Sequence, residues 1–403
     1  MEQWKEYRLG DLCTISSSKR IFAKEYVNEG IPFYRGKEII QLHKGEEISD
    51  HLYISKVRYS EIRNKYGVPK VGDILLTSVG TLGIPYIIKH SDFYFKDGNL
   101  TWFYNFKNIR NTYLYYWFCS KYGKSQIDKI AIGSTQKALT INSLSEILIQ
   151  IPPFKVQDKI VEILKSLDSK IDLNRKINSN LEEQAKALFK SWFIDFEPFK
   201  DGKFVDSELG KIPEGWEVVT IGDVTENIKD KVGDRDNIKV LSPITSGQLV
   251  LSEDYFSKQV FSNSIAKYIV VKHNDFAYNP ARINIGSIGM NEFNFDGCVS
   301  PVYVVFRCQK GYEYFFNLYR RTTFFAEEVK KRAIGGVRQT LSYKDLSLIQ
   351  LVYPPQKVVD NFNSIIISLL HTIHSNDVSN KKLEAIRDLL LPRLMSGEIN
   401  VRL

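Results

Sequence analysis

The chain has 403 residues, of which 43% are hydrophobic, so it is long and apolar enough for more than one core and is not a disordered chain. Its formal net charge of +8 favours a polyanionic partner, although an ordinary basic protein would carry the same charge. The four cysteines are widely spaced and form no CxxC pair, which argues against a zinc ribbon or a disulfide framework. No apolar run reaches the length of a membrane span, and the start of the chain, MEQWKEYRLGDL, is charged. These observations predict a cytoplasmic protein with no membrane association.

Residues 1–153 contain short runs rich in Tyr, Phe, Ile and Val, punctuated by Gly and Pro. Examples are IPFYR, GDILLTSV and LTWFYNF. Such runs are typical of short strands, and a helical pattern intervenes near 112–122. We therefore predict that residues 1–153 form a compact α+β domain.

Residues 154–199 are predicted to contain one long helix. Between 157 and 192 apolar side chains recur every three or four residues, which is the pattern of a helix that packs along another helix. Two positions on this apolar seam are polar, Asn174 and Asn178. At about 1.5 Å per residue the helix would be roughly 55 Å long, enough to separate two domains.

The second half of the chain repeats the first. Adding 202 to the seam positions gives a second seam within residues 356–403, with its polar positions at Asn376 and Asn380. The AIG and PP motifs that precede the first helix recur at the same offset. Residues 200–355 are therefore predicted to form a linker and a second domain, and 356–403 a second spacer helix. The predicted fold class is α+β, with two globular domains separated by two long antiparallel helices in a pseudo-two-fold repeat.

The polar seam positions predict a register for the helix pair. A pseudo-two-fold axis places Asn174 opposite Asn380 and Asn178 opposite Asn376. A buried Asn pair costs stability but penalises every register that sets one Asn against a leucine. We predict that these four residues hold the register and, with it, the gap between the domains. The alternative is that they mark a thin, solvated part of the seam.

No motif for catalysis, a cofactor or a metal is found in the sequence. Adenine methylation needs a polar residue before Pro-Pro-aromatic to hold the flipped base, but Ile151 precedes the first Pro-Pro, and a glutamine follows the second. Both are interpreted as turns that start the long helices. A glycine-rich strand-to-helix turn and an HExxH motif are also lacking. The sequence predicts a protein that is not an enzyme and has neither cofactor nor metal.

Several motifs occur in order along the chain, and some of them occur once in each half. They are WKEYRLGDL and WEVVTIGDV, GSTQKALTINSL and GGVRQTLSYKDL, the IPP and YPP turns, LFKSWFIDFEPF with ELGKIPEGW at the junction, and RDLLLPRLMSGEI. In these motifs the chain resembles the specificity (S) subunits of type I restriction-modification systems, which act in host defence. The resemblance implies that each target-recognition domain binds one half of a split sequence in double-stranded DNA, while the helices set the gap. It also implies two methyltransferase (M) subunits and restriction (R) subunits as partners. The assembled complex, and not this chain, would then carry adenine-N6 methyltransferase and endonuclease activity.

Candidate DNA-contacting side chains lie in loops that contain glycine or serine. Base edges are read by Arg, Lys, Asn and Gln, with Ser and Thr helping, and phosphates are bound by Lys and Arg. The candidates in the first domain are Lys19, Arg20, Arg35, Lys37, Thr77, Ser78, Thr135, Gln136 and Lys137. Those in the second domain are Thr245, Ser246, Arg282, Arg338 and Gln339. The loops around 136 and 338 are favoured because they are equivalent in the repeat yet differ in side chain. A purely phosphate-binding role stays open for Lys19, Arg20, Arg35 and Lys37.

Two other functions remain open from the sequence. A stand-alone DNA-binding regulator would use the same two domains without enzyme partners, and a protein scaffold would use only the helix pair. A steep salt dependence of DNA binding would exclude the scaffold. Co-purification with a methyltransferase would exclude the regulator.

Overall fold

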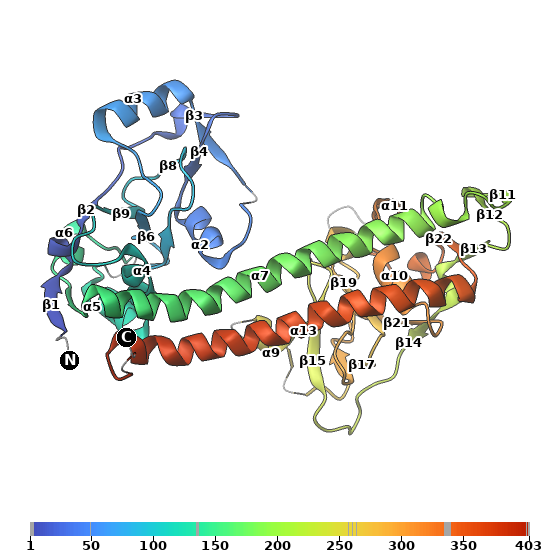
Figure 1. Ribbon diagram of the computed structural model, residues 1–403. Helices are drawn as coiled ribbons and strands as arrows, with labels where there is room; N and C mark the ends of the chain where they lie inside the picture. Colours follow the sequence, from blue (N-terminus) through green and yellow to red (C-terminus); the bar gives the residue numbers. More distant parts are fainter. Residues whose placement is uncertain are drawn as a thin grey trace. The chain divides into compact units, whose positions relative to one another are not determined.

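The structure is a computed structural model that describes residues 4–48, 50–133, 137–256, 258–259, 261–262, 264–333, 340–399 and 401. Contacts divide the chain, shown in Figure 1, into two compact units. Unit 1 comprises residues 1–176 and 376–403, and unit 2 comprises residues 177–375. The structure has two helices of 40 residues, α7 (Phe154–Phe193) and α13 (Gln356–Met395). Each helix contributes one segment to unit 1 and one segment to unit 2.

Two four-stranded sheets form the globular part of unit 1. One is antiparallel with the order β2-β9-β6-β7, and the other has the order β3-β5-β4-β8, in which β4 and β8 run parallel. Their bounds are β2 (Thr14–Ser16), β3 (Tyr26–Val27), β4 (Ile31–Tyr34), β5 (Leu52–Ile54), β6 (Ile74–Thr77), β7 (Pro85–Ile87), β8 (Tyr94–Phe95) and β9 (Leu100–Tyr104). A separate antiparallel pair joins β1 (Lys5–Arg8) to β10 (Leu148–Ile151).

Short helices cover these sheets. They are α1 (Leu9–Leu12), η1 (Ala23–Glu25), α2 (Gly36–Lys44), α3 (Lys56–Tyr66), α4 (Asn111–Cys119), α5 (Lys121–Ile130) and α6 (Ile141–Ser145). Serine hydroxyls start two of them, because Ser55 accepts the Arg58 N–H at 3.2 Å and Ser120 accepts the Gly123 N–H at 3.0 Å. Phe103 of β9 and Trp117 of α4 belong to the main core of this unit.

Unit 2 has the same kind of paired sheets. The antiparallel sheet has the order β14-β21-β18-β19, and the second sheet has the order β16-β15-β20-β17 with β15 and β20 parallel. Their bounds are β14 (Thr225–Ile228), β15 (Lys239–Pro243), β16 (Leu249–Leu251), β17 (Ile269–Val271), β18 (Phe276–Tyr278), β19 (Ile288–Met290), β20 (Gly297–Val299) and β21 (Val304–Cys308). The helices are α8 (Ile221–Val224), α9 (Ser252–Tyr255), η3 (Ile283–Ile285), α10 (Glu313–Tyr319), α11 (Thr323–Arg332) and α12 (Tyr343–Leu346). The linker after α7 forms η2 (Glu197–Phe199) and a hairpin of β11 (Phe204–Ser207) with β12 (Gly210–Pro213), and β13 (Glu217–Thr220) pairs with β22 (Gln350–Tyr353).

The two units repeat one scaffold. Helices α4, α5, α6 and α7 correspond to α10, α11, α12 and α13 at a constant offset of 202, as from Asn111 to Glu313. The orders β2-β9-β6-β7 and β14-β21-β18-β19 also match. Among the described residues, α2 and α3 have no counterpart of similar length in unit 2.

The segments of the two long helices run antiparallel within each unit. In unit 1, Asp168 and Arg175 of α7 contact Arg387 and Glu384 of α13, so the partner number falls as the α7 number rises. In unit 2, Phe193 packs edge-on against Phe362 with ring centroids 4.7 Å apart. Every predicted seam position on α7 is buried or half-buried, as the 3.5-residue spacing requires. The predicted α+β fold with two repeated domains and long antiparallel helices is therefore confirmed.

Within the described part of the chain, no helix is both long and apolar enough to span a membrane. The long helices carry charged side chains throughout, in keeping with a packing role on one face only.

Candidate nucleic-acid interface

The parallel strand pair of unit 1 places basic side chains at one sheet edge. Tyr34 at the end of β4 pairs with Phe95 at the end of β8, and parallel strands bring their carboxyl ends to the same edge. Arg35 follows β4 directly, and Asp97 lies two residues after the end of β8. Arg20 is tied to the same edge because its Nε donates to Asp97 Oδ2 at 2.8 Å. The structure thus brings Arg20 and Arg35, which the sequence placed in separate loops, to one edge.

The Arg35 guanidinium is engaged by acidic neighbours. Its Nη2 donates to Glu38 Oε1 at 2.6 Å, and Glu38 is only 1% exposed. Burial alone would raise the pKa of Glu38, but hydrogen bonds from the side chain and backbone of Arg35 outweigh it and leave that pKa lowered. Asp50 lies 3.5 Å from Arg35 and 3.7 Å from Lys37. These contacts favour a structural role for Arg35 and leave the exposed Lys37 ammonium more accessible.

Lys19 lies on the surface beside an aromatic ring. Its Nζ is 4.6 Å from the centroid of the Tyr66 ring, while its backbone N–H donates to the Tyr94 hydroxyl at 2.7 Å. Lys19 itself is exposed. Lys19 is therefore placed to meet a phosphate without rearrangement of the loop.

Thr77 and Ser78 are buried, which corrects the expectation that they form an exposed DNA-contacting loop. Thr77 Oγ1 accepts the Ile84 N–H at 2.9 Å, and Ser78 Oγ lies 2.6 Å from Thr101 Oγ1. Thr77 is the last residue of β6 and Ser78 follows it directly, so neither lies in the exposed turn. The exposed residues here are Gly80 and Thr81, which the sequence reasoning missed although two glycines flank the turn.

In unit 2 two turns meet at the equivalent edge. The β15–β16 turn exposes Thr245 and Ser246, and the η3 turn exposes Arg282 and Ile285. Ser287 Oγ joins the turns by donating to the carbonyl oxygen of Pro243 at 2.8 Å. A Cβ atom at Gly286 would lie 2.7 Å from the Thr245 carbonyl oxygen, so only glycine permits this approach. Ile285 offers an apolar contact of the kind that thymine methyl groups accept, and the sequence reasoning missed it.

A buried arginine holds these turns from behind. Arg320 donates from Nη2 to the Gly247 carbonyl oxygen at 2.8 Å and from Nη1 to the Ile288 carbonyl oxygen at 2.8 Å. Asn317 Oδ1 accepts from Nε at 2.9 Å. Burial lowers the pKa of Arg320 to about 9, and nearby Arg321 adds to the effect, yet the group stays protonated at neutral pH. The clamp fixes the turn that carries Thr245 and Ser246.

Each of the two favoured recognition loops is followed by a residue that is anchored in the same way in both repeats. Thr135, Gln136, Arg338 and Gln339 lie outside the described residues. The residue that follows each loop is fixed, because Leu139 N–H donates to Ser78 O at 2.9 Å and Leu341 N–H donates to Pro280 O at 3.1 Å. These two hydrogen bonds are equivalent at an offset of 202, and the exposed Lys137 precedes the first of them.

One predicted Asn pair lies in unit 1. Asn174 Nδ2 donates to Asn380 Oδ1 at 2.8 Å, and the two residues are 1% and 7% exposed. In unit 2, Asn178 Nδ2 donates to the Ile373 carbonyl oxygen at 3.3 Å. Asn376 is half-buried. The opposition of Asn178 and Asn376 stays a prediction.

The described residues contain no group of three or more His, Cys, Asp or Glu side chains arranged to hold a metal ion. The four cysteines are unpaired, and burial raises the pKa of Cys13, Cys119 and Cys298 to about 12. At neutral pH these thiols are protonated and behave as apolar side chains.

Together the fold and the edge residues define a class of two-headed proteins, in which two copies of one α+β scaffold present different polar side chains and each copy is followed by a long helix. A family model described as the type I restriction modification DNA specificity domain matches residues 1–183. The MjaIX specificity subunit of Methanocaldococcus jannaschii is 28% identical over 99% of this chain and 94% of that protein, and the HindI specificity subunit of Haemophilus influenzae is 24% identical over 99% and 100%. A crystal structure of the S subunit of a type I restriction-modification system from M. genitalium matches with a TM-score of 0.60 at 13% identity, over 98% of this chain and 96% of that one. Over almost its whole length the chain is therefore similar to specificity subunits of type I restriction-modification systems.

Proposed function

We propose that this chain is the DNA-reading subunit of a type I restriction-modification complex in the cytoplasm, in which each domain reads one half of a bipartite sequence. One observation supports this most directly. The two units share a scaffold with the same strand order and the same series of helices, but the equivalent edges carry Arg20, Arg35 and Lys37 in one and Thr245, Ser246 and Arg282 in the other. A shared scaffold with different edges suits two different half-sites on one duplex.

The duplicated scaffold also supports two copies of a partner. Each unit repeats the same strand pair and the same helix start, β1 with β10 before α7 and β13 with β22 before α13. Two methyltransferase subunits would each meet an equivalent surface, and restriction subunits would join them. Adenine-N6 methylation and DNA cleavage are then activities of the complex, while this chain supplies the sequence specificity. The alternative of a stand-alone regulator has no support from the family relationship.

The test is reconstitution with the methyltransferase subunits. The complex should transfer labelled methyl groups from S-adenosylmethionine to a bipartite site, whereas the isolated chain should transfer none. Methyl transfer by the isolated chain would overturn the proposal. Binding of the isolated chain to duplex DNA should also weaken steeply with salt, because several phosphate contacts release counterions.

A domain exchange tests the division of labour. Replacing residues 1–153 with the corresponding domain of another family member should change one half of the methylated sequence and leave the other half unchanged. Simultaneous change of both halves would show that the domains do not read independently. The matched control exchanges residues 200–355 instead, and the opposite half-site should change.

A further inference from the structure

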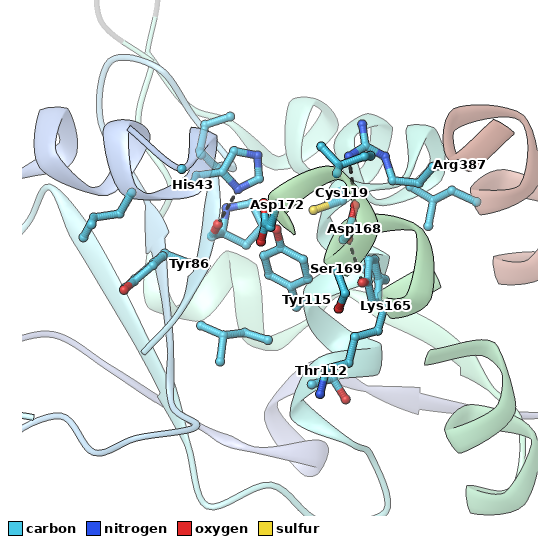
Figure 2. A pocket seen from close by; sticks show the side chains of 18 of the residues that line it. His43, Tyr86, Thr112, Tyr115, Cys119, Lys165, Asp168, Ser169, Asp172 and Arg387 are labelled. Carbon is cyan, nitrogen blue, oxygen red and sulfur yellow. Dashed lines mark hydrogen bonds and ion pairs between the residues drawn. The ribbon is translucent and has the colours of Figure 1, made fainter. Parts of the chain in front are cut away.

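Unit 1 contains a cavity of about 540 Å³ between its globular part and its two helix segments. Figure 2 shows side chains that line it, including His43, Tyr115, Cys119, Asp168 and Arg387. A cavity removes contact partners from the side chains that line it. At this place, therefore, apolar packing alone does not fix the globular part to the two helix segments.

The Asp168 carboxylate links three helices, α4, α7 and α13, beside this cavity. Tyr116 of α4 donates its hydroxyl to Asp168 Oδ2 at 2.7 Å, and Arg387 of α13 donates from Nη1 to Asp168 Oδ1 at 3.0 Å. Asp168 itself lies on α7. Its side chain is 28% exposed and that of Arg387 is 31% exposed, so both contacts are partly shielded from water. The dashed lines in Figure 2 mark contacts of this kind around Asp168.

The protonation states suit these contacts. Burial raises the pKa of Tyr116, and the neighbouring Asp168 carboxylate raises it further. The phenol therefore keeps its proton and acts as the hydrogen-bond donor to Asp168. Burial alone would lower the pKa of Arg387, but hydrogen bonds to Asp168 and Asp388 outweigh it and raise that pKa. Arg387 therefore remains charged at neutral pH.

The equivalent place in unit 2 is built differently. At the offset of 202, Tyr116 corresponds to Leu318, Asp168 to Leu370, and Arg387 to Ala185. All three line a cavity of only about 30 Å³. The second domain is thus fixed to its helix segments by apolar packing at this place, whereas the first is fixed by a polar network beside a cavity.

A second polar contact crosses the same region of unit 1. Arg175 of α7 donates from Nη1 to the carbonyl oxygen of Lys44, the last residue of α2, at 3.3 Å, and from Nη2 to Glu384 at 3.0 Å. Helix α2 has no counterpart of similar length among the described residues of unit 2. Both links are therefore specific to the first domain.

We infer that Asp168 is a positioning residue that fixes the orientation of the first domain on α7 and α13 and thereby determines which gap between the two half-sites is accepted. It touches no DNA in this role. The inference rests on the proposed function, because a gap has meaning only for a bipartite reader. Loss of the network should broaden the accepted gap while leaving the bases read in both half-sites unchanged.

The experiment compares four variants, Asp168→Ala, Asp168→Glu, Tyr116→Phe and Asp388→Asn, with the unaltered chain in the reconstituted complex. Asp168→Ala removes both contacts, and Tyr116→Phe removes one with almost no change in volume. Asp388→Asn is the control, because Asp388 is 66% exposed and also contacts Arg387 but reaches neither α4 nor α7. The readout is methylation of a DNA library in which the half-sites are constant and the gap varies by single base pairs.

In Asp168→Ala, the preference for the best gap over its neighbours should fall by about tenfold, as expected for loss of hydrogen bonds to a charged group. Tyr116→Phe should show a smaller fall, and Asp388→Asn should match the unaltered chain. Asp168→Glu, which keeps the charge, should restore part of the preference. One sharp, unchanged gap in both Asp168→Ala and Tyr116→Phe would overturn the inference.

A second readout does not depend on methylation. Amide hydrogen exchange in α4, residues 111–119, should be faster in Asp168→Ala and Tyr116→Phe than in Asp388→Asn. Unchanged exchange in both variants would also overturn the positioning role. If instead the unaltered complex methylates no bipartite site, the proposed function fails, and the exchange data still decide whether Asp168 fixes the domain.

Discussion

Asn174 and Asn380 form a buried side-chain hydrogen bond of 2.8 Å between the two long helices of unit 1. Among the described atoms, Asn174 Oδ1 has no hydrogen-bond partner. A buried acceptor without a partner costs about 1–3 kcal/mol. The pair is therefore less stabilising than leucine at these positions would be, and its value lies in specifying alignment.

Replacing Asn174, Asn178, Asn376 and Asn380 with Leu and Ile should raise thermal stability and loosen the preferred gap between half-sites. The expected gain in the free energy of unfolding is about 1–3 kcal/mol for the buried acceptor alone. A helix pair that slides by one heptad moves by about 10 Å, or roughly three base pairs. Thermal melting and methylation of a gap library measure the two effects. A gap that stays single and sharp would show that the domains or the partner subunits fix it.

Arg35→Ala should destabilise the first domain rather than change only its DNA affinity. The substitution leaves the buried Glu38 carboxylate without its main partner, at an expected cost of about 1–3 kcal/mol in the free energy of unfolding. Lys37→Ala is the matched control, since Lys37 is exposed and lies 3.7 Å from the exposed Asp50. Urea denaturation measures both. Equal stability of the two variants would return Arg35 to the set of available DNA contacts.

Arg320→Lys should weaken base discrimination in the second half-site without contact between this residue and DNA. Lysine cannot reproduce the forked contacts to Gly247, Ile288 and Asn317, so the turn with Thr245 and Ser246 loses its support. We expect a loss of about 1.5–3 kcal/mol in stability and a relaxed sequence preference on that side only. Arg321→Lys makes the same substitution at the exposed neighbouring position and serves as the control. Unaltered discrimination in Arg320→Lys would separate this clamp from DNA reading.

Base-reading and phosphate-binding side chains should differ in their effect on sequence preference. Gln136→Ala and Arg338→Ala should each relax one half-site, at about 1–3 kcal/mol of binding free energy. Lys19→Ala and Arg20→Ala should instead weaken binding to all sequences alike and reduce the salt slope by about one for each phosphate that is no longer neutralised. Titrations over a panel of duplexes at several salt concentrations distinguish these outcomes. An unaltered preference in Gln136→Ala would remove that loop from the interface.

Acid should destabilise unit 1 through His43. Burial lowers the pKa of His43 below its ordinary value of 6.5, and Lys124 and Arg387 lower it further, while a hydrogen bond to the Pro85 carbonyl oxygen acts in the opposite direction. As the pH falls below 6.5, His43 takes up a proton in the unfolded chain before it does so in the folded chain. The contribution of neutral His43 to the free energy of unfolding is therefore complete above pH 6.5 and is lost as the pH falls towards the folded-state pKa. His43→Gln should flatten this acidic limb in a series of melting temperatures. The exposed His51, replaced in the same way, serves as the control, and identical limbs in both variants would contradict the assignment.

Much of the architecture follows from the sequence because it depends on periodicity. The apolar seam predicted the course of both long helices, and the offset of 202 related the two domains, since each buried face needs the same side-chain pattern wherever the scaffold recurs. Thr77 and Ser78 were misplaced because a strand end and a turn share the same small polar residues. Their burial depends on contacts with Ile84 and Thr101 that no local pattern contains.

The polar networks could not be predicted for a similar reason. Glu38 follows Arg35 by three residues, but its burial and hence its hold on the guanidinium come from the surrounding sheet. Asp168 looks like any solvated position beside a helix seam. Its role depends on Tyr116, 52 residues earlier, and Arg387, 219 residues later.

The make-up of unit 1 also has a consequence for synthesis of the protein. Leu391, Leu394 and Met395 are buried in the same core as Phe103 and Trp117, so the domain that leaves the ribosome first completes its core last. Until the end of α13 emerges, that core stays open to water, and its closure depends on contacts between residues far apart in the sequence, which form slowly. Any first domain transplanted into this chain must therefore accept these three side chains as well as read its own half-site.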